Sequence, residues 1–255
     1  MKNLLIKNAQ LFFTLFLLFI LHLPFVFANT KPKPYAYSPL EGIVTNELTG
    51  NTKNETIEAT AVMYDSLHLQ DLGLCEQAFD YAVKGYEYMK ENGQIINENV
   101  ISIVDFTEPS SQKRLFVVDM KLRKILFNTY VAHGQGSGKE YATHFSNKPE
   151  SFQSSLGFYL TSDTYTGKNG FSLHLNGIEK GINDKAEDRA IVMHGAPYVS
   201  ESLIRSQGYI GRSWGCPAVP EKLNKPIIEK IKNGSCLFIY GKNKNYFRQS
   251  KILNS

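Results

Sequence analysis

Short runs of β-branched and aromatic residues, separated by turn-forming residues, dominate the chain from residue 100 onward. The runs are Val100–Phe106, Arg114–Asp119, Lys124–His133, Gly157–Ser162, Phe171–Leu175, Arg189–His194 and Cys236–Tyr240. Between the second and the third, Met120-Lys121-Leu122-Arg123 is typical of a hairpin connection. Because helices do not alternate with these strands, the pattern favours an antiparallel sandwich or partial barrel over a parallel sheet.

Three segments have helical spacing instead. Leu72–Asn92 places apolar residues on one stripe at intervals of three or four and ends at Asn92-Gly93. Shorter helices are expected at Ser200–Gln207 and Pro220–Lys232. The predicted fold class is therefore mainly β with peripheral helices, and the N-terminal helix packs on the sheet.

The first 28 residues are typical of a secretory signal. Lys2 and Lys7 precede an apolar run, Leu11–Leu21, and Ala28 is a small residue suited to cleavage. An uncleaved membrane anchor is the alternative, but the run is shorter than the ~20 residues that a bilayer requires. We therefore expect cleavage after Ala28, no stable membrane insertion afterwards, and a protein exported to the periplasm or cell envelope.

The remaining chain divides by composition. Residues 29–59 are rich in Lys, Pro, Thr and Asn and predict a linker or a poorly ordered arm. Residues 60–97 form a helical N-terminal attachment, residues 98–242 the main domain, and residues 243–255 a polar tail.

Composition limits the classes of partner and of site. Hydrophobic residues make up 42% and charged residues 20% of the 255, as in an ordinary globular protein, and the net charge is only +4. No basic stripe interleaved with aromatics indicates a nucleic-acid partner. The three cysteines are Cys75, Cys216 and Cys236, so at least one thiol is free. Cys75 and Cys236 are expected to be core residues, although their pairing stays open.

The densest group of special residues lies between Ile191 and Pro220. His194-Gly195 follows an apolar run, and the segment ends in Gly211-Arg212-Ser213-Trp214-Gly215-Cys216-Pro217. A thiol in a glycine turn and an imidazole at a strand end are the parts of a cysteine nucleophile site. In this hypothesis Cys216 is the nucleophile, His194 is the base, and the turn that contains Gly215 presents backbone N–H groups to the oxyanion.

Other interpretations of the same residues exist. A cysteine beside a glycine is often a small buried hydrophobe. A zinc site of His133, His174, His194 and Cys216 is a weaker alternative, because no two of them have close metal-ligand spacing. We expect neither a metal nor another cofactor.

The same segment resembles the YkuD-like L,D-transpeptidase catalytic domains of bacterial cell-wall enzymes. Their signature is His-Gly, a gap, and Ser-X-Gly-Cys. Here it is His194-Gly195, 17 residues from Ala196 to Arg212, and Ser213-Trp214-Gly215-Cys216. More narrowly, the site resembles the murein L,D-transpeptidase branch, whose motif is HGA-x-YVS … GRS-x-GCPA. The likeness extends through Val117–Gly138 and Ser151–Leu173 and covers roughly residues 70 to 242.

The resemblance implies an L,D-transpeptidase-like β-sandwich or partial barrel, and it implies a reaction. Cys216 attacks the carbonyl of the third residue of a peptidoglycan tetrapeptide stem, D-alanine leaves, and a stem-peptide amine resolves the thioester into a 3-3 cross-link. It also implies that the carbonyl of Gly195, or of a neighbour, holds His194 Nδ1. Ser213 is either a hydrogen-bonding brace for the cysteine loop or a substrate contact, and we favour the brace.

The sequence of this segment departs from the commoner family pattern at two positions. Trp214 stands where His is frequent, and Pro217-Ala218 stand where Ile-Arg is frequent. Arg212 can replace the missing arginine as a carboxylate partner, and Trp214 can form a wall over the stem. Further substrate-binding candidates are Tyr198, His174 and His133. Arg189 lies five residues before His194, too far along one strand to touch it.

Three alternatives to transpeptidation stay open. With water as the acceptor, the protein is an L,D-carboxypeptidase. With another exported substrate, it is a cysteine peptidase, and with an unreactive thiol it is a non-catalytic cell-wall binding module. The sequence does not determine the oligomeric state.

Overall fold

The computed structural model describes residues 51–255. The expected signal, residues 1–28, and most of the expected arm, residues 29–59, lie outside this range. Where the arm enters it, the chain is helical rather than irregular, because α2 spans Asn51–Ser66. None of the helices among the described residues has both the length and the apolar character needed to cross a bilayer.

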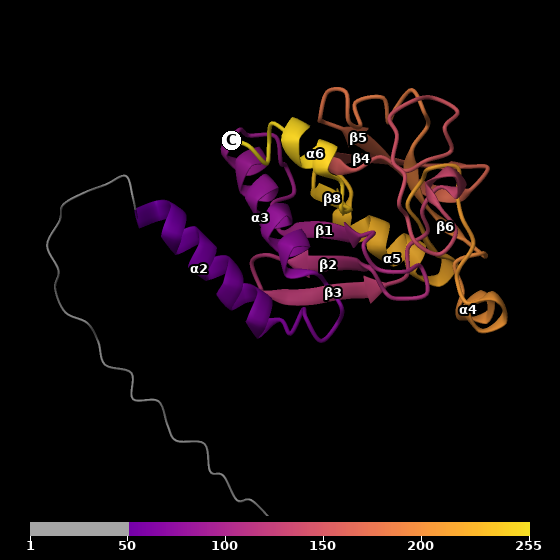
Figure 1. Ribbon diagram of the computed structural model, residues 1–255, viewed down its shortest axis with the longest axis horizontal. Coiled ribbons are helices and arrows are strands. Elements are labelled where there is room, and N and C mark those ends of the chain that lie inside the picture. Colours follow the sequence, from indigo (N-terminus) through magenta and orange to yellow (C-terminus); the bar gives the residue numbers. More distant parts are fainter. Residues whose placement is uncertain (1–50) are drawn as a thin grey trace, which may run out of the picture. The chain divides into compact units, whose positions relative to one another are not determined.

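One eight-stranded sheet organises the described part of the chain (Figure 1). Its order is β3-β2-β1-β8-β4-β5-β6-β7. The strands are β1 Val100–Asp105, β2 Leu115–Asp119, β3 Lys124–Thr129, β4 Gly157–Gly167, β5 Gly170–Gly177, β6 Val192–Ala196, β7 Ala218–Pro220 and β8 Cys236–Tyr240. Five of the seven pairings are antiparallel, and the β1–β8 and β6–β7 pairings are parallel. The prediction of a mainly β, antiparallel-rich fold is confirmed.

The sheet curls until its two edges meet. Beyond β3 the chain continues to Ala132, which forms a bridge with Ala218 in β7, and Gly134 bridges Ser213. The Ala132 N–H donates to the Ala218 carbonyl at 2.8 Å. The expected partial barrel is therefore nearly closed, and the closing seam carries the turn that leads to Cys216.

Helices cover both faces of the central strands. Phe158 of β4 stacks on Phe238 of β8 and lies against Gly85 of α3, Glu76–Glu91. Thr161, three residues further along β4 and so on the opposite face, donates to the Ile231 carbonyl of α5, Glu221–Ile231. With a helix on each face, every residue of β1 and β8 is buried.

Several elements differ from the sequence prediction. The predicted strand Lys124–His133 ends at Thr129, and β4 runs on to Gly167 through a bulge that follows Thr161. The three-residue strand β7 was not predicted. A short helix, α4, spans Glu201–Gln207 as expected.

The C-terminal segment, expected to be a polar tail, packs on the domain. Helix α6, Lys244–Gln249, buries Tyr246, whose hydroxyl donates to the Glu179 carboxylate at 3.1 Å. Ile252 and Leu253 are buried as well, and the Leu253 carbonyl accepts from Lys84 Nζ of α3 at 2.7 Å. Accordingly, the chain end in Figure 1 lies beside α3. A few buried side chains anchor this segment to the domain, whereas its average composition is polar and therefore predicts an exposed tail.

Candidate active site

Two neighbouring strands bring the candidate nucleophile and base together. In the parallel pairing of β6 with β7, His194 is the partner of Ala218. Cys216 lies two residues before Ala218, in the turn that leads into β7. The Val192 N–H, two residues before His194, approaches Cys216 Sγ at 3.5 Å. The 22 residues that separate the pair in sequence are thus spanned by one strand pairing.

The cysteine turn is shaped by Gly215 and fastened by Ser213. Gly215 has φ +129°, and a Cβ there would meet the Gln153 carbonyl oxygen at 2.9 Å, so only glycine fits. Ser213 Oγ donates to the Cys216 carbonyl at 2.6 Å and accepts from the Gly215 N–H at 3.1 Å. Both contacts are those of the brace expected of Ser213.

The backbone donors near the thiol differ from expectation at Gly215. Its N–H is already used by Ser213 Oγ, so it is not free to bind an oxyanion. The N–H groups of Trp214 and Cys216 have no acceptor in the described chain other than the Cys216 thiol itself. These two donors are the ones available to a developing negative charge.

His194 is held in one tautomer. Its Nδ1 lies 2.9 Å from the Gly195 carbonyl oxygen, which can only accept, so Nδ1 carries the proton and Nε2 keeps its lone pair. Burial lowers the pKa of His194, although the Gly195 contact opposes this. Burial likewise raises the pKa of the Cys216 thiol. The resting pair is therefore a neutral thiol and a neutral imidazole that can accept its proton.

A family model matches most of the chain. The model describes an L,D-transpeptidase catalytic domain and matches residues 70–240. This chain belongs to that L,D-transpeptidase family. The matched range begins near the N-terminus of α3, so the helix and the sheet belong to one family domain, and the resemblance drawn from the Cys216 segment is confirmed.

The solved structures that this chain resembles are described as L,D-transpeptidases. One from Mycobacterium smegmatis is 13% identical, with a TM-score of 0.35 over 56% of this chain and 59% of that chain. One from Stackebrandtia nassauensis is 16% identical, with a TM-score of 0.34 over 65% and 67%. One from Xylanimonas cellulosilytica is 12% identical, with a TM-score of 0.32 over 80% and 100%. No curated protein matches the sequence.

His133, a substrate-contact candidate, does not lie at the surface of this L,D-transpeptidase domain. Its ring is fully buried, with Nδ1 2.7 Å from Arg114 Nη2 and Nε2 3.3 Å from the Gly138 carbonyl. Burial, followed by the charge of Arg114, lowers the pKa of His133 to about 3. The ring therefore accepts from Arg114, donates to Gly138 and holds the 134–138 turn. Sequence alone could not reveal this, because Arg114 is 19 residues away.

Three further substrate-contact candidates lie in or beside the segment that precedes Cys216. Trp214 is 70% exposed and meets the Phe152 ring edge-on, with centroids 5.7 Å apart. Arg212 is exposed, and its Nη1 donates to the Gly138 carbonyl at 3.1 Å. Tyr198 is half-buried beside Gly211, whose N–H donates to its carbonyl at 2.7 Å.

His174 lines a second cavity close to the thiol. The cavity, about 330 Å³, is bordered by Ala190 and Val192, the two residues whose backbone contacts Cys216 Sγ. His174 Nδ1 is 3.1 Å from an Asp163 oxygen, and its ring stacks on Tyr165.

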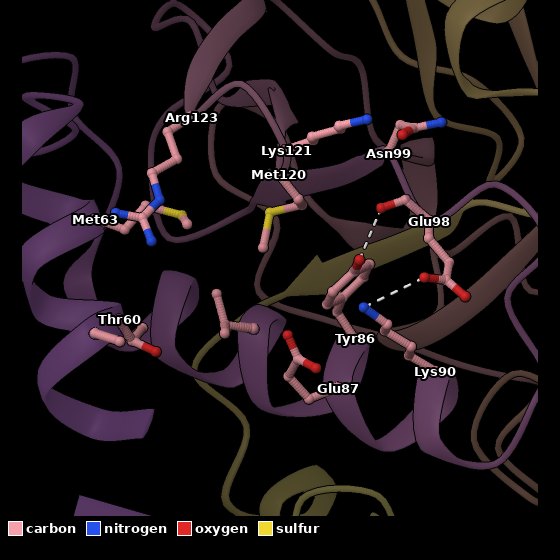
Figure 2. A pocket seen from close by; sticks show the side chains of 12 residues that line it. Thr60, Met63, Tyr86, Glu87, Lys90, Glu98, Asn99, Met120, Lys121 and Arg123 are labelled. Carbon is pink, nitrogen blue, oxygen red and sulfur yellow. Dashed lines mark hydrogen bonds and ion pairs between the residues drawn. The ribbon is translucent and has the colours of Figure 1, made fainter. Parts of the chain in front are cut away.

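A further cavity, about 460 Å³, is shown in Figure 2. It is bordered by α2, α3 and the β2–β3 turn. On its wall the Tyr86 hydroxyl donates to the Glu98 carbonyl, and Lys90 pairs with the Glu98 carboxylate at 3.3 Å. Neither His194 nor Cys216 borders it.

The described part of the chain contains neither a group of metal-ligating side chains nor a disulfide. No three His, Cys, Asp or Glu side chains are grouped there as a metal site. Cys75, Cys216 and Cys236 are all unpaired. Cys236 is buried in β8, and Cys75 is the N-cap residue of α3.

Proposed function

We propose that this chain is a peptidoglycan L,D-transpeptidase that forms a thioester on Cys216 with His194 as its base. Membership of the L,D-transpeptidase family supports the reaction class. The observation that carries the residue assignment is the contact between His194 Nδ1 and the Gly195 carbonyl. It leaves Nε2 as a proton acceptor on the strand next to Cys216.

Acylation begins with proton transfer from Cys216 Sγ to His194 Nε2. The thiolate attacks the carbonyl carbon of the third stem residue, forming a C–S bond and an oxyanion, which the N–H groups of Trp214 and Cys216 stabilise. The C–N bond to D-alanine then breaks, and the imidazolium gives its proton to the leaving nitrogen. The products are a Cys216 thioester and free D-alanine.

Resolution repeats these steps with a new nucleophile. A stem-peptide amine loses a proton to His194 and attacks the thioester, and the thiolate leaves and regains its proton. The new amide is the 3-3 cross-link. Water in place of the amine gives an L,D-carboxypeptidase, so the acceptor decides between the two activities.

We propose substrate contacts at the exposed rim. Arg212 is a carboxylate partner, and Trp214 provides an apolar wall. Tyr198 and His174 border the same region. His133 is withdrawn from this role because its ring is fully buried.

The proposed activity requires export, because stem peptides lie outside the cytoplasmic membrane. We propose that residues 1–28 are the signal that directs it, that 29–59 form a connecting arm, and that 98–242, together with the preceding helical segment 60–97, carry out catalysis. Detection of a mature N-terminus at Asn29 in an envelope fraction tests this.

The function is tested by product analysis after incubation of the purified protein with a disaccharide tetrapeptide. We expect released D-alanine and cross-linked dimers. Tripeptide without dimer identifies the carboxypeptidase instead. A muropeptide that binds and remains intact identifies a binding module and contradicts the proposal, and cleavage of ordinary L,L-peptides identifies a general peptidase.

A further inference from the structure

Arg189 is a charged side chain without an ion-pair partner, held just below the cysteine turn. It is half-buried, and its guanidinium donates to four neutral acceptors. Nη1 contacts the Ser146 carbonyl at 2.9 Å and Ser155 Oγ at 2.6 Å, and Nη2 contacts the Gln153 carbonyl at 2.5 Å and Ser151 Oγ at 3.4 Å. No carboxylate lies within ion-pair distance of it in the part of the chain described here.

The same guanidinium lies against the turn that presents the thiol. The Cβ position of Gly215 is 3.3 Å from Arg189 Nη2 and 2.9 Å from the Gln153 oxygen that Arg189 binds. The residues that follow Arg189 wrap the sulfur: the thiol donates to the Ala190 carbonyl at 3.7 Å, and the Val192 N–H approaches it at 3.5 Å. Arg189 therefore connects loop 146–155, the Gly215 turn and the strand that carries His194.

An unneutralised cation at this place has an electrostatic consequence. Removing a charge from water is costly unless other groups compensate for it, and four neutral acceptors compensate only in part. When Cys216 loses its proton to His194, the new negative charge on sulfur faces this guanidinium. Burial raises the pKa of the Cys216 thiol, and the Val192 N–H and the charge of Arg189 both lower it. The other ionisable neighbour, Tyr198, has its pKa raised to about 12 and stays neutral.

We propose that Arg189 is a positioning residue for Cys216, which clamps loop 146–155 beneath the Gly215 turn and stabilises the Cys216 thiolate by its charge. The inference rests on the proposed role of Cys216 as nucleophile. It assigns to Arg189 a function toward the thiol, which its sequence separation from His194 concealed.

The test is the pH dependence of Cys216 alkylation by iodoacetamide, followed by mass spectrometry of the Cys216 peptide. In Arg189→Gln the midpoint of the alkylation profile is expected to rise by roughly one pH unit, because a nearby cation favours the thiolate. Arg189→Lys keeps the charge and is expected to keep the midpoint, while losing part of the clamp and so lowering the melting temperature. Arg205→Gln, on the exposed side of α4, is the matched control and leaves both unchanged.

Arg189→Met, with an apolar stem of similar length, replaces the glutamine variant if that variant does not fold. A midpoint that stays at the wild-type value in a folded neutral variant overturns the inference, and so does an equal rise in Arg189→Lys. Failure of the proposed function has a different signature: His194→Ala leaves the wild-type alkylation rate unchanged, and no substrate adduct forms on Cys216.

Discussion

His194 and His133 each follow an extended segment and each precede a glycine, yet their surroundings differ. His194 Nδ1–H donates a hydrogen bond to the adjacent Gly195 carbonyl, and Nε2 has no partner among the described residues. His133 has both ring nitrogens occupied, by Arg114 and by the Gly138 carbonyl. An imidazole can exchange protons only through a nitrogen that is free to do so. His194 therefore has a chemical capacity that His133 lacks.

The difference arises from the strand pairings around each ring. His194 lies within β6, between β5 and β7, where its own backbone neighbour satisfies one nitrogen. His133 lies past the end of β3, where the chain turns under a buried arginine that needs acceptors. Arg114 Nη2 donates to His133 Nδ1, and Arg114 Nε and Nη2 both donate to the Val131 carbonyl. The second histidine thus stabilises a buried cation and the turn that follows.

Removing the thiol tests whether His194 has a partner for its free nitrogen. Cys216→Ala is expected to abolish D-alanine release and to change the melting temperature little, because the thiol is small and only partly enclosed. Turnover is measured on disaccharide tetrapeptide. Cys75→Ala, at the N-cap of α3, is the control and should keep full activity. Turnover that persists in Cys216→Ala would contradict the role of Cys216 as the nucleophile.

Removing each imidazole in turn sharpens the contrast between the histidines. His194→Ala should lower kcat by about 10²- to 10⁴-fold, as expected for loss of a general base, with a smaller loss of stability because its ring has one hydrogen-bond partner. His133→Ala should do the reverse, lowering the free energy of unfolding by roughly 2–4 kcal/mol, because Arg114 and Gly138 lose a buried partner. Steady-state kinetics measures kcat of both variants, and denaturant unfolding measures their free energies of unfolding. Equal losses of kcat would contradict the separation of roles.

His133 contributes strongly to the pH dependence of stability. Its folded pKa is about 3, below the ordinary value of 6.5, so between these values the unfolded chain binds a proton that the folded chain does not. The stabilisation is complete above pH 6.5 and decreases as pH falls toward 3. At about 1.4 kcal/mol per pKa unit, we expect a loss of roughly 3 kcal/mol by pH 4. His133→Gln should flatten the curve, whereas His144→Gln, on an exposed loop, should not.

Ser213 braces the turn that carries Cys216 and therefore lies at the same site as His194. Ser213→Ala removes a hydroxyl that satisfies the Gly215 N–H and the Cys216 carbonyl. We expect a loss of about 1–3 kcal/mol in unfolding free energy and slower alkylation of Cys216, because the turn loosens. Ser206→Ala, on the surface of α4, is the matched control. Unchanged alkylation in a destabilised Ser213 variant would assign the serine to stability alone.

The smallest effect is expected at Arg212, which contacts the carbonyl of Gly138 that His133 also binds. Arg212→Ala should raise KM about 3- to 10-fold at nearly constant kcat, in line with one exposed charge-assisted contact to a substrate carboxylate. Steady-state kinetics with Arg205→Ala as the control measures it. An unchanged KM removes Arg212 from the substrate site.

The sequence predicted those features that depend on neighbours close in the chain. The strand runs, α4, α5 and the glycine-shaped turn at Gly215 all follow from local patterns. The hypothesis that pairs Cys216 with His194 rests on an apolar strand and a glycine turn, each of which limits where a side chain can lie. The role of Ser213 also follows from its position three residues before the Cys216 carbonyl that it binds.

Features that depend on distant partners were not predictable. The acceptors of Arg189 lie 34 to 43 residues earlier in the chain, and two of them are backbone carbonyls, which have no sequence signature. His133 looked like a cleft residue because Gly134, Gly136 and Gly138 surround it. β7 has only three residues, and α6 is anchored by Glu179, 67 positions before Tyr246.

Intact-protein mass spectrometry after rapid mixing with disaccharide tetrapeptide tests the central claim most directly. The wild-type protein is expected to gain the mass of the substrate less D-alanine, on the Cys216 peptide and in a form that hydroxylamine releases, as it does thioesters. In His194→Ala the same adduct should accumulate far more slowly, and in His133→Ala its rate per folded molecule should match the wild type. An adduct on another residue, or turnover without any adduct, would contradict the account.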